Sequence, residues 1–191
     1  MNENKTTISV FIGSVRNGRM GDKVAGWVSK ALEARNHNVH IIDPDKFPEL
    51  LTLRLPNHYN PKPSPQMQQV HKWLEESDGF VLVTPEYNHS FSGTIKNALD
   101  NFMPEYEKKP FGIASYSIGP FGGIRANEAL RIVISELKGV STPIPLMISE
   151  VQDAFDGSGK LKDDSYTEKL SQFLDNFEWY VKALKNARTK K

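Results

Sequence analysis

Apolar residues fall into two alternating patterns along the chain. Short runs led by β-branched or aromatic residues predict buried strands at residues 7–12, 39–42, 80–83, 111–117 and 140–149. Between and after these runs, apolar side chains recur every three or four residues, which is the period of one helix face. The stripes predict helices near residues 24–32, 65–74, 95–102, 126–137 and 165–184. Strands and helices that alternate in this way form a parallel sheet with helices on both faces.

Chain length narrows the architecture further. The 191 residues make one domain of ordinary size, so we predict a single domain over residues 1–191. Flexible ends are expected at residues 1–6 and 188–191. A five-stranded parallel sheet of this size favours an α/β, flavodoxin-like fold with the strand order 2-1-3-4-5. In that order the ligand crevice lies at the carboxyl ends of strands one and three, with the end of strand four alongside.

Residues 79–102 contain the clearest junction between a strand and a helix. The strand at 80–83 is expected to stop before Pro85, because proline cannot donate a hydrogen bond to a sheet ladder. Ser92 is the expected N-cap of the helix that follows. The polar residues 86–90 would then lie at the carboxyl edge of the sheet, where ligands bind. An ordinary turn between a strand and a helix explains the same residues equally well.

Two other loops are expected at the same edge, at residues 13–21 and 117–123. Both are rich in glycine and serine, and the first also contains Arg16 and Arg19. Free N–H groups at the start of a helix, combined with arginine, favour a phosphate monoester. Neither a P-loop nor a Gly-x-Gly-x-x-Gly fingerprint is present. Surface arginines are more often solvated or paired with carboxylates, so that alternative stays open.

Composition excludes several classes of function. The formal net charge of +1 provides no general attraction to nucleic acid or to an anionic membrane. The absence of cysteine excludes disulfides, thiolate catalysis and cysteine-bound metals, and the five histidines show no metal-ligand spacing. No apolar run approaches the ~18 residues of a membrane span, and residues 1–6 do not resemble a signal peptide. We therefore expect a cytoplasmic protein without a metal, nucleic-acid or membrane partner.

Three motifs stand in the expected loops. They are Gly13-Ser14-Val15-Arg16, then Pro85-Glu86-Tyr87-Asn88 with Gly93 and Lys96-Asn97-Ala98-x-Asp100, and finally Gly122-Gly123-x-Arg125-Ala126. In order and spacing, the chain resembles the NADPH-dependent FMN reductases, which are flavodoxin-like quinone, azo-dye and flavin reductases. The resemblance covers nearly the whole chain, and the middle motif is its most specific part.

The resemblance implies non-covalently bound FMN. The positions that match its phosphate contacts are Ser14, Arg16, Arg19, Met20 and Gly21. Those that match the loop along the isoalloxazine ring are Pro85, Glu86, Tyr87 and Asn88, and those at the other ring edge are Ser117, Gly119 and Gly122. The chain departs from many relatives at Arg19, where serine is common, and at Ile118, where glycine is common.

The chemistry implied by the resemblance is hydride transfer from NADPH, with NADH as an alternative donor, to N5 of the flavin. The electrons then pass to a quinone, an azo compound or free flavin in a ping-pong sequence. No catalytic side chain is required, and Tyr87 is expected to stack on the ring or to gate access. Tyr87 and residues 57–60 are expected walls of the shared substrate space. A homodimer or homotetramer is expected.

Two other functions remain open at this stage. A flavodoxin-type electron carrier would share the fold, but such carriers are strongly acidic and hold the phosphate in a neutral loop. The net charge of +1 and the two arginines of the first loop favour the enzyme. A flavin-bound redox-sensing partner of another protein could coexist with enzyme activity.

Overall fold

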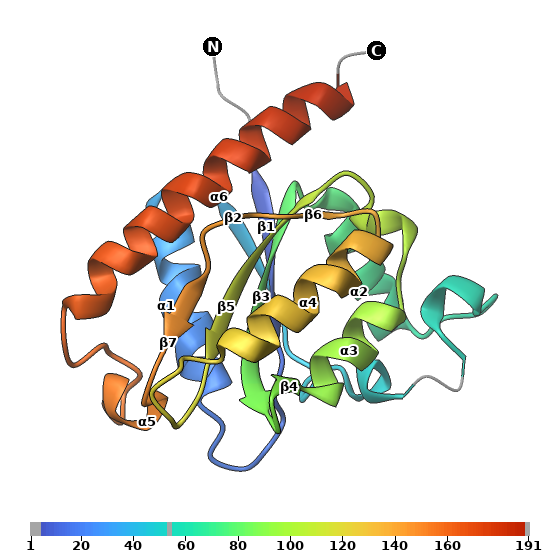
Figure 1. The fold of residues 1–191 in the computed structure, drawn as a ribbon. Coiled ribbons are helices and arrows are strands. Elements are labelled where there is room, and N and C mark those ends of the chain that lie inside the picture. Colours follow the sequence, from blue (N-terminus) through green and yellow to red (C-terminus); the bar gives the residue numbers. More distant parts are fainter. Residues whose placement is uncertain (1–4, 53–54, 190–191) are drawn as a thin grey trace.

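The computed structural model, described over residues 5–52 and 55–189, contains one seven-stranded sheet (Figure 1). Its main path runs β2-β1-β3-β5-β6 and is parallel throughout. These strands are β1 (Thr7–Ile12), β2 (Asn38–Ile42), β3 (Gly79–Tyr87), β5 (Pro110–Tyr116) and β6 (Val140–Ser141). The path is the predicted flavodoxin-like order, with the predicted strands at their expected places.

The strand count differs from the expected five because the predicted strand at 140–149 is divided. Its first part is β6 and its second part is β7 (Leu146–Ile148), and both pair with β5. Pro143 and Pro145 lie between them and lack the N–H groups needed to continue a ladder. The seventh strand, β4 (Ser90–Phe91), pairs with the end of β3.

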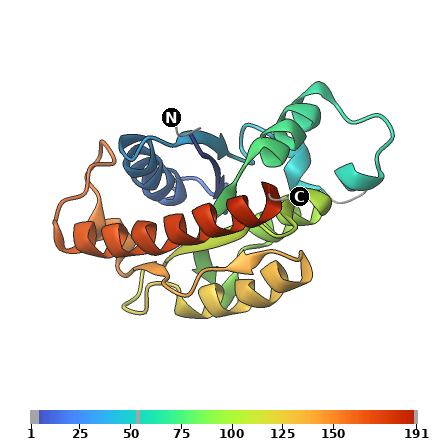
Figure 2. The ribbon, with the colours of Figure 1, turned by 90° about the horizontal axis from the view of Figure 1, so that it is seen from above.

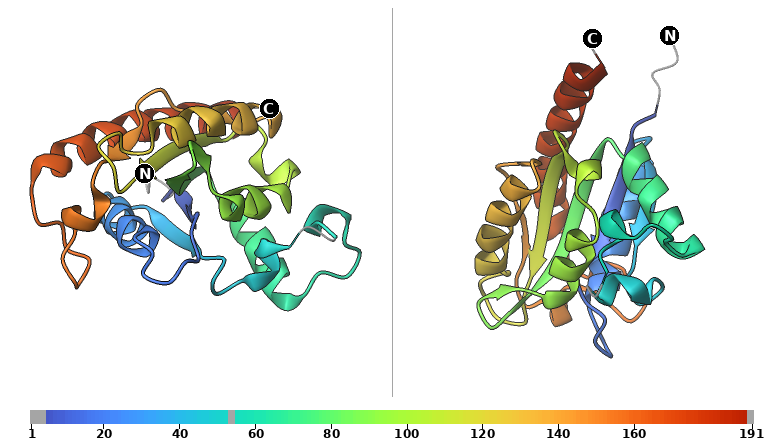
Figure 3. Two further views of the ribbon diagram at one scale, coloured as in Figure 1. Left: turned by 60° about the horizontal axis from the view of Figure 1, so that its bottom comes forward. Right: turned by 90° about the vertical axis from the view of Figure 1, so that its right-hand side faces the viewer.

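Helices cover both faces of the sheet, as predicted (Figures 2 and 3). One core lies beneath α1 (Gly21–Ala34), the short α5 (Val151–Ala154) and α6 (Ser165–Thr189). The second core lies beneath α2 (Pro65–Glu76), α3 (Gly93–Asp100) and α4 (Ile124–Glu136). Successive residues of β3 alternate between the two cores: Val81 belongs to the first, and Leu82 to the second. Short 3₁₀ turns occur at Pro48–Leu51, Asn57–Tyr59 and Pro104–Tyr106.

Strand β3 continues beyond the point where the sequence predicts its end. Pro85 lies inside the strand and pairs with Tyr116 of β5. On the other side of β3, pairing with β1 ends at Val83, whose carbonyl accepts a 2.7 Å hydrogen bond from Gly13 N–H. The nitrogen of Pro85, two residues later, faces that same side beyond the end of β1. Its missing N–H therefore removes no ladder bond, which is the usual condition for proline in a strand.

A two-residue turn folds β3 back onto β4. Asn88 and His89 both have positive φ, at 50° and 65°, between the paired residues Tyr87 and Ser90. Two successive left-handed residues form the type I′ turn that suits the twist of a hairpin, and asparagine tolerates this conformation well. The predicted polar loop at 86–90 is therefore a small hairpin that projects from the carboxyl edge of the sheet.

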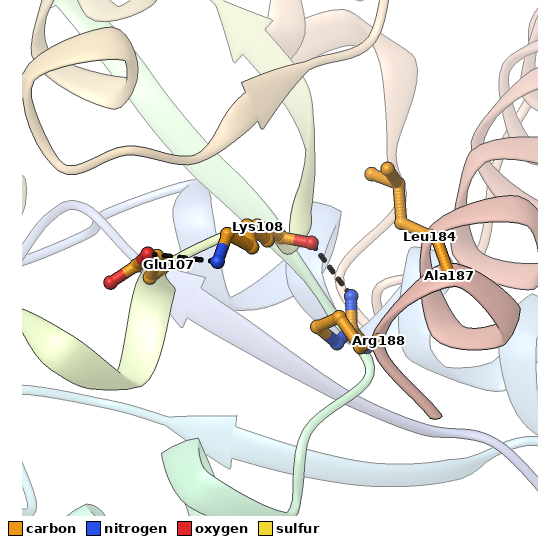
Figure 4. A pocket seen from close by; sticks show the side chains of 5 residues that line it. All are labelled: Glu107, Lys108, Leu184, Ala187 and Arg188. Carbon is orange, nitrogen blue, oxygen red and sulfur yellow. Dashed lines mark hydrogen bonds and ion pairs between the residues drawn. The ribbon is translucent and has the colours of Figure 1, made fainter. Parts of the chain in front are cut away.

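The flexible ends expected at residues 1–6 and 188–191 stay a prediction, although hydrogen bonds attach described residues of both ends to the domain. Thr6 forms a hydrogen bond with His37 through its hydroxyl, and Arg188 donates to the carbonyl of Lys108 at 2.7 Å. Lys108 and Arg188 line a hollow of about 580 Å³ at the amino edge of the sheet (Figure 4). Residues 1–4 and 190–191 lie outside the described part of the chain. Within that part, no helix, α6 included, has the length and apolar character needed to cross a membrane.

Lys109, next to this hollow, is expected to make stability depend on pH. Its side chain is buried and donates to the carbonyls of Leu74 and Glu75 at 2.7 and 3.1 Å. Burial lowers the pKa of Lys109 from 10.5 to about 8. Between pH 8 and 10.5, Lys109 is protonated in the unfolded chain and deprotonated in the folded one. The free energy of unfolding therefore rises with pH, by at most about 1.4 kcal/mol per pH unit. Urea unfolding from pH 7 to 10 measures this slope.

The matched control for that measurement is the exposed neighbour Lys108. Lys109→Met should lose the rise above pH 8, and Lys108→Met should keep it. Equal slopes in both variants would contradict the assignment to Lys109.

Candidate functional site

Three loops meet at the carboxyl edge of the sheet, at the bottom of Figure 1 and turned forward in the left view of Figure 3. The first loop (residues 13–21) follows β1, the second (residues 85–88) ends β3, and the third (residues 117–123) follows β5. The strands are direct neighbours, because Ile12 pairs with Val83 and Pro85 pairs with Tyr116. The structure therefore brings the three predicted loops together.

The first loop presents a row of N–H groups. Helix α1 begins at Gly21, and its N-cap Met20 has no side chain to satisfy the first turn. By contrast, α2 and α3 are capped by the hydroxyls of Ser64 and Ser92. Among residues 5–52 and 55–189 we find no acceptor for the N–H groups of Ser14, Val15, Arg16, Asn17, Gly18, Met20 and Gly21. An anion is the natural partner of such a row.

Arg19 is held away from the row by a carboxylate. Its guanidinium donates two 2.7 Å hydrogen bonds to the two oxygens of Asp43, just after β2, and one of 2.8 Å to the carbonyl of Ser14. The Asp43 side chain is 5% exposed. Hydrogen bonding to Asp43 raises the pKa of Arg19. Asp43 was not predicted from the sequence, where it is one of several polar residues after a short strand.

Arg16 and Tyr87 connect the first two loops. The Arg16 guanidinium lies 3.6 Å from the centre of the Tyr87 ring, and the Tyr87 hydroxyl lies 3.0 Å from the hydroxyl of Ser14. Arg16 is exposed, and no ion pair occupies it within the described residues. Stacking on an aromatic face limits the orientations of the guanidinium while leaving its N–H groups available. Arg16 is therefore held in place while its N–H groups stay available to a ligand. Arg19 is also held in place, but Asp43 occupies its guanidinium.

The second loop is fixed to helix α4. One oxygen of Glu86 accepts from the backbone N–H of Arg125 at 3.0 Å, and the other accepts from its guanidinium at 3.1 Å. The carboxylate thus lies at the N-terminus of α4, where the helix dipole favours negative charge. Arg125 belongs to a motif noted in the sequence, although its pairing with Glu86 was not foreseen.

The third loop has its carbonyl groups turned into the protein. Every carbonyl from Ser117 to Gly123 accepts a hydrogen bond, from donors that include the hydroxyls of Ser115 and Ser149 and the backbone of Glu150 and Val151. The N–H groups of Ile118, Gly119, Phe121 and Gly122 have no acceptor in the described part of the chain. This loop thus offers a second set of N–H donors at the same edge.

Tyr116, the last residue of β5, lies below the first loop and was not predicted. Its hydroxyl is buried and has no partner within the described residues. A Cβ atom on Gly21 would lie 2.8 Å from that hydroxyl, so only glycine allows α1 to begin this close to β5. Burial raises the pKa of Tyr116, which therefore stays protonated.

Two expectations concern residues outside these loops. The expectation that residues 57–60 form a wall of the site stays a prediction; within this segment, Asn57 and His58 form hydrogen bonds with Asn101, just beyond the end of α3. The predicted lack of a metal site remains a prediction, although no group of His, Asp or Glu side chains in residues 5–52 and 55–189 is arranged to hold a metal ion.

Comparisons with known proteins agree with the fold and the motifs. A family model described as NADPH-dependent FMN reductase matches residues 6–153. An NAD(P)H-dependent FMN reductase from Pseudomonas aeruginosa is 35% identical over 127 residues, covering 63% of this chain and 68% of that protein. A quinone reductase from Pseudomonas putida is 30% identical over 183 residues, covering 92% and 95%. The solved structure of FerB, a flavoenzyme NAD(P)H:(acceptor) oxidoreductase from Paracoccus denitrificans, is similar with a TM-score of 0.73 at 25% identity, covering 93% and 98%.

Proposed function

The chain belongs to the NADPH-dependent FMN reductase family, and we propose that it reduces quinones with NADPH through FMN bound at the three loops. It is an oxidoreductase that uses FMN and NADPH. Bound FMN supplies the redox chemistry, by accepting a hydride from NADPH and returning two electrons to the acceptor. The residues of this chain bind FMN, orient it and enclose it.

The donor groups at the edge fit the two ends of FMN. A phosphate monoester needs several N–H donors and a positive charge, and the first loop supplies the free N–H row together with Arg16. Asp22, exposed in the first turn of α1, does not contribute to this set. The polar edge of a flavin ring needs donors without charge, which the N–H groups of Gly119 and Gly122 in the third loop supply. The observation that carries the proposal is that these N–H groups of the first and third loops have no acceptor among the described residues.

Within this arrangement the side chains have distinct roles. Ser14 and Arg16 bind the phosphate, together with the N–H groups of Met20 and Gly21. Arg19 positions the first loop through Asp43 instead of contacting the phosphate. Fixed N–H donors of the third loop stabilise negative charge that develops on the ring edge, because they need no reorganisation when the charge appears.

The second loop lies between these two sets of donors. The Glu86–Arg125 pair holds Pro85 and Asn88 in place along the ring, and Tyr87 closes the phosphate end by stacking on Arg16. Tyr87 is thus a gating residue and not a proton donor. No side-chain acid or base is required for hydride transfer.

A ping-pong steady state is the expected kinetic result. The three loops form one edge of one domain, so nicotinamide and quinone compete for the same space above the ring. Initial rates measured with varied NADPH at several fixed quinone concentrations should give parallel double-reciprocal lines. Intersecting lines would demonstrate a ternary complex and contradict the shared space.

The same assay separates the remaining functions. An electron carrier would show almost no NADPH-dependent turnover of any small acceptor. Replacing the quinone with an azo compound or with free flavin ranks the three acceptor classes by kcat/KM. A quinone value below both others would reject the quinone as the preferred acceptor while leaving the reductase activity in place.

A further inference from the structure

The third loop carries two large apolar side chains that face solvent. Ile118 is 80% exposed and Phe121 is 61% exposed, and they are separated only by Gly119 and Pro120. Single exposed apolar residues are common on protein surfaces and need no explanation. These two differ because they immediately precede Gly119 and Gly122, whose N–H groups the proposed function assigns to the flavin ring.

The backbone beneath these side chains is held firmly. The carbonyl of Ile118 accepts from the side chain of Gln152 at 3.4 Å, and that of Phe121 accepts from Ile124 N–H at 3.2 Å. The two carbonyls between them accept from Glu150 N–H at 3.1 Å and from the Ser149 hydroxyl at 2.8 Å. Hydrogen bonds to these carbonyls fix the backbone and with it the direction in which each side chain leaves the loop. Ile118 and Phe121 are therefore presented outward by the fold.

Phe121 is also connected to the second loop. The Arg125 guanidinium lies 5.1 Å from the centre of its ring, and the same guanidinium is paired with Glu86. The contact of Phe121 with Arg125 and the pairing of Arg125 with Glu86 thus connect the third loop to the second loop, which is expected to lie along the flavin ring. Phe121 therefore lies beside the charged pair that fixes the second loop, and the proposed function places the acceptor at that loop.

We infer that Ile118 and Phe121 are specificity-determining residues that contact the hydrocarbon substituent of a quinone acceptor. This inference rests on the proposed function, because it places the quinone ring above FMN at the three loops. Quinones with the same planar ring system differ only in their substituents, so contact with a substituent is what distinguishes one of them from another. The two side chains favour quinones that carry an apolar chain over polar quinones with the same ring.

The test compares one quinone ring with and without its chain. The probes are a dimethoxy-methyl-benzoquinone and the same ring bearing a decyl chain. Equilibrium dialysis against the FMN-loaded protein without NADPH measures Kd directly, so binding is separated from turnover. The variants are Ile118→Ser and Phe121→Ser, and the control is Ile132→Ser, which removes an isoleucine of α4 that is 76% exposed.

The loop variants are expected to lose the preference for the quinone that carries the decyl chain. Each loop variant should raise Kd for the decyl quinone about 5- to 30-fold, on the basis of the apolar area that loses its contact. Kd for the chain-free quinone and for FMN should stay unchanged, and Ile132→Ser should behave as the wild type. Steady-state KM for the decyl quinone should rise in parallel, with kcat nearly constant.

Several results would overturn the inference. A contact with the decyl chain would be rejected if a loop variant lost affinity equally for both quinones or if Ile132→Ser lost as much affinity as the loop variants. It would also be rejected if the wild type bound both quinones equally well. A smaller oligomer for either loop variant by sedimentation would place the side chains in a subunit interface instead. Unfolding of a loop variant would show that its side chain is needed for the stability of the fold and would overturn the inference for that residue. Lack of any NADPH–quinone turnover in the wild type would reject the proposed function itself, which is a separate outcome.

Discussion

Replacing Arg16 with alanine is expected to weaken FMN binding about 10- to 150-fold, which corresponds to roughly 1.5–3 kcal/mol for a charge-assisted contact. The Arg16 side chain stacks on Tyr87 and has no carboxylate partner in the described residues, so its removal leaves no buried charge behind. Fluorescence titration of the apoprotein with FMN measures the change. The free energy of unfolding of the apoprotein should remain close to that of the wild type.

Two comparisons show whether the lost contact is to the phosphate. Riboflavin lacks the phosphate, so it should bind weakly to the wild type and about equally to Arg16→Ala. Arg16→Lys keeps the charge but loses the planar guanidinium, and should fall between the wild type and alanine. An unchanged Kd for FMN in Arg16→Ala would mean that the N–H row alone binds the phosphate.

Replacing Arg19 with serine is expected to destabilise the apoprotein by about 2–4 kcal/mol, because it leaves the Asp43 carboxylate buried without its partner. Arg19 is 14% and Asp43 5% exposed, so solvent replaces little of the lost interaction. Urea unfolding without FMN measures this effect and avoids the stabilisation that bound ligand adds. The opposite pattern, unchanged stability with a large loss of FMN affinity, would make Arg19 a phosphate ligand.

A double-mutant cycle isolates the pair itself. Asp43→Ala also removes the acceptor of a 3.1 Å hydrogen bond from Asp45 N–H, and this separate loss cancels in the cycle. The coupling between Arg19→Ser and Asp43→Ala should be about 1–3 kcal/mol. A coupling near zero would indicate that the two side chains act on stability independently.

Some parts of the site could be predicted from short stretches of sequence. The apolar runs and stripes determine where strands and helices form, because burial of one face requires the matching period. Alternation of the two then places the ends of β1, β3 and β5 at one edge, and so brings Ser14, Tyr87 and Ser117 into one region. The serine N-caps of α2 and α3 could likewise be predicted from the sequence, because each cap is a hydrogen bond to a backbone N–H only three residues later.

The contacts decided only by tertiary structure are those between loops. Whether Arg19 or Arg16 is free depends on which carboxylate lies within reach, and Asp43 is 24 residues from Arg19 along the chain. Whether Pro85 ends β3 depends on where the neighbouring β1 stops, because only then is its missing N–H without consequence. The sequence by itself determined the elements and the edge at which they meet. Partner choice among charged and polar groups required the folded chain, because those interactions depend on distance in space and not on separation in sequence.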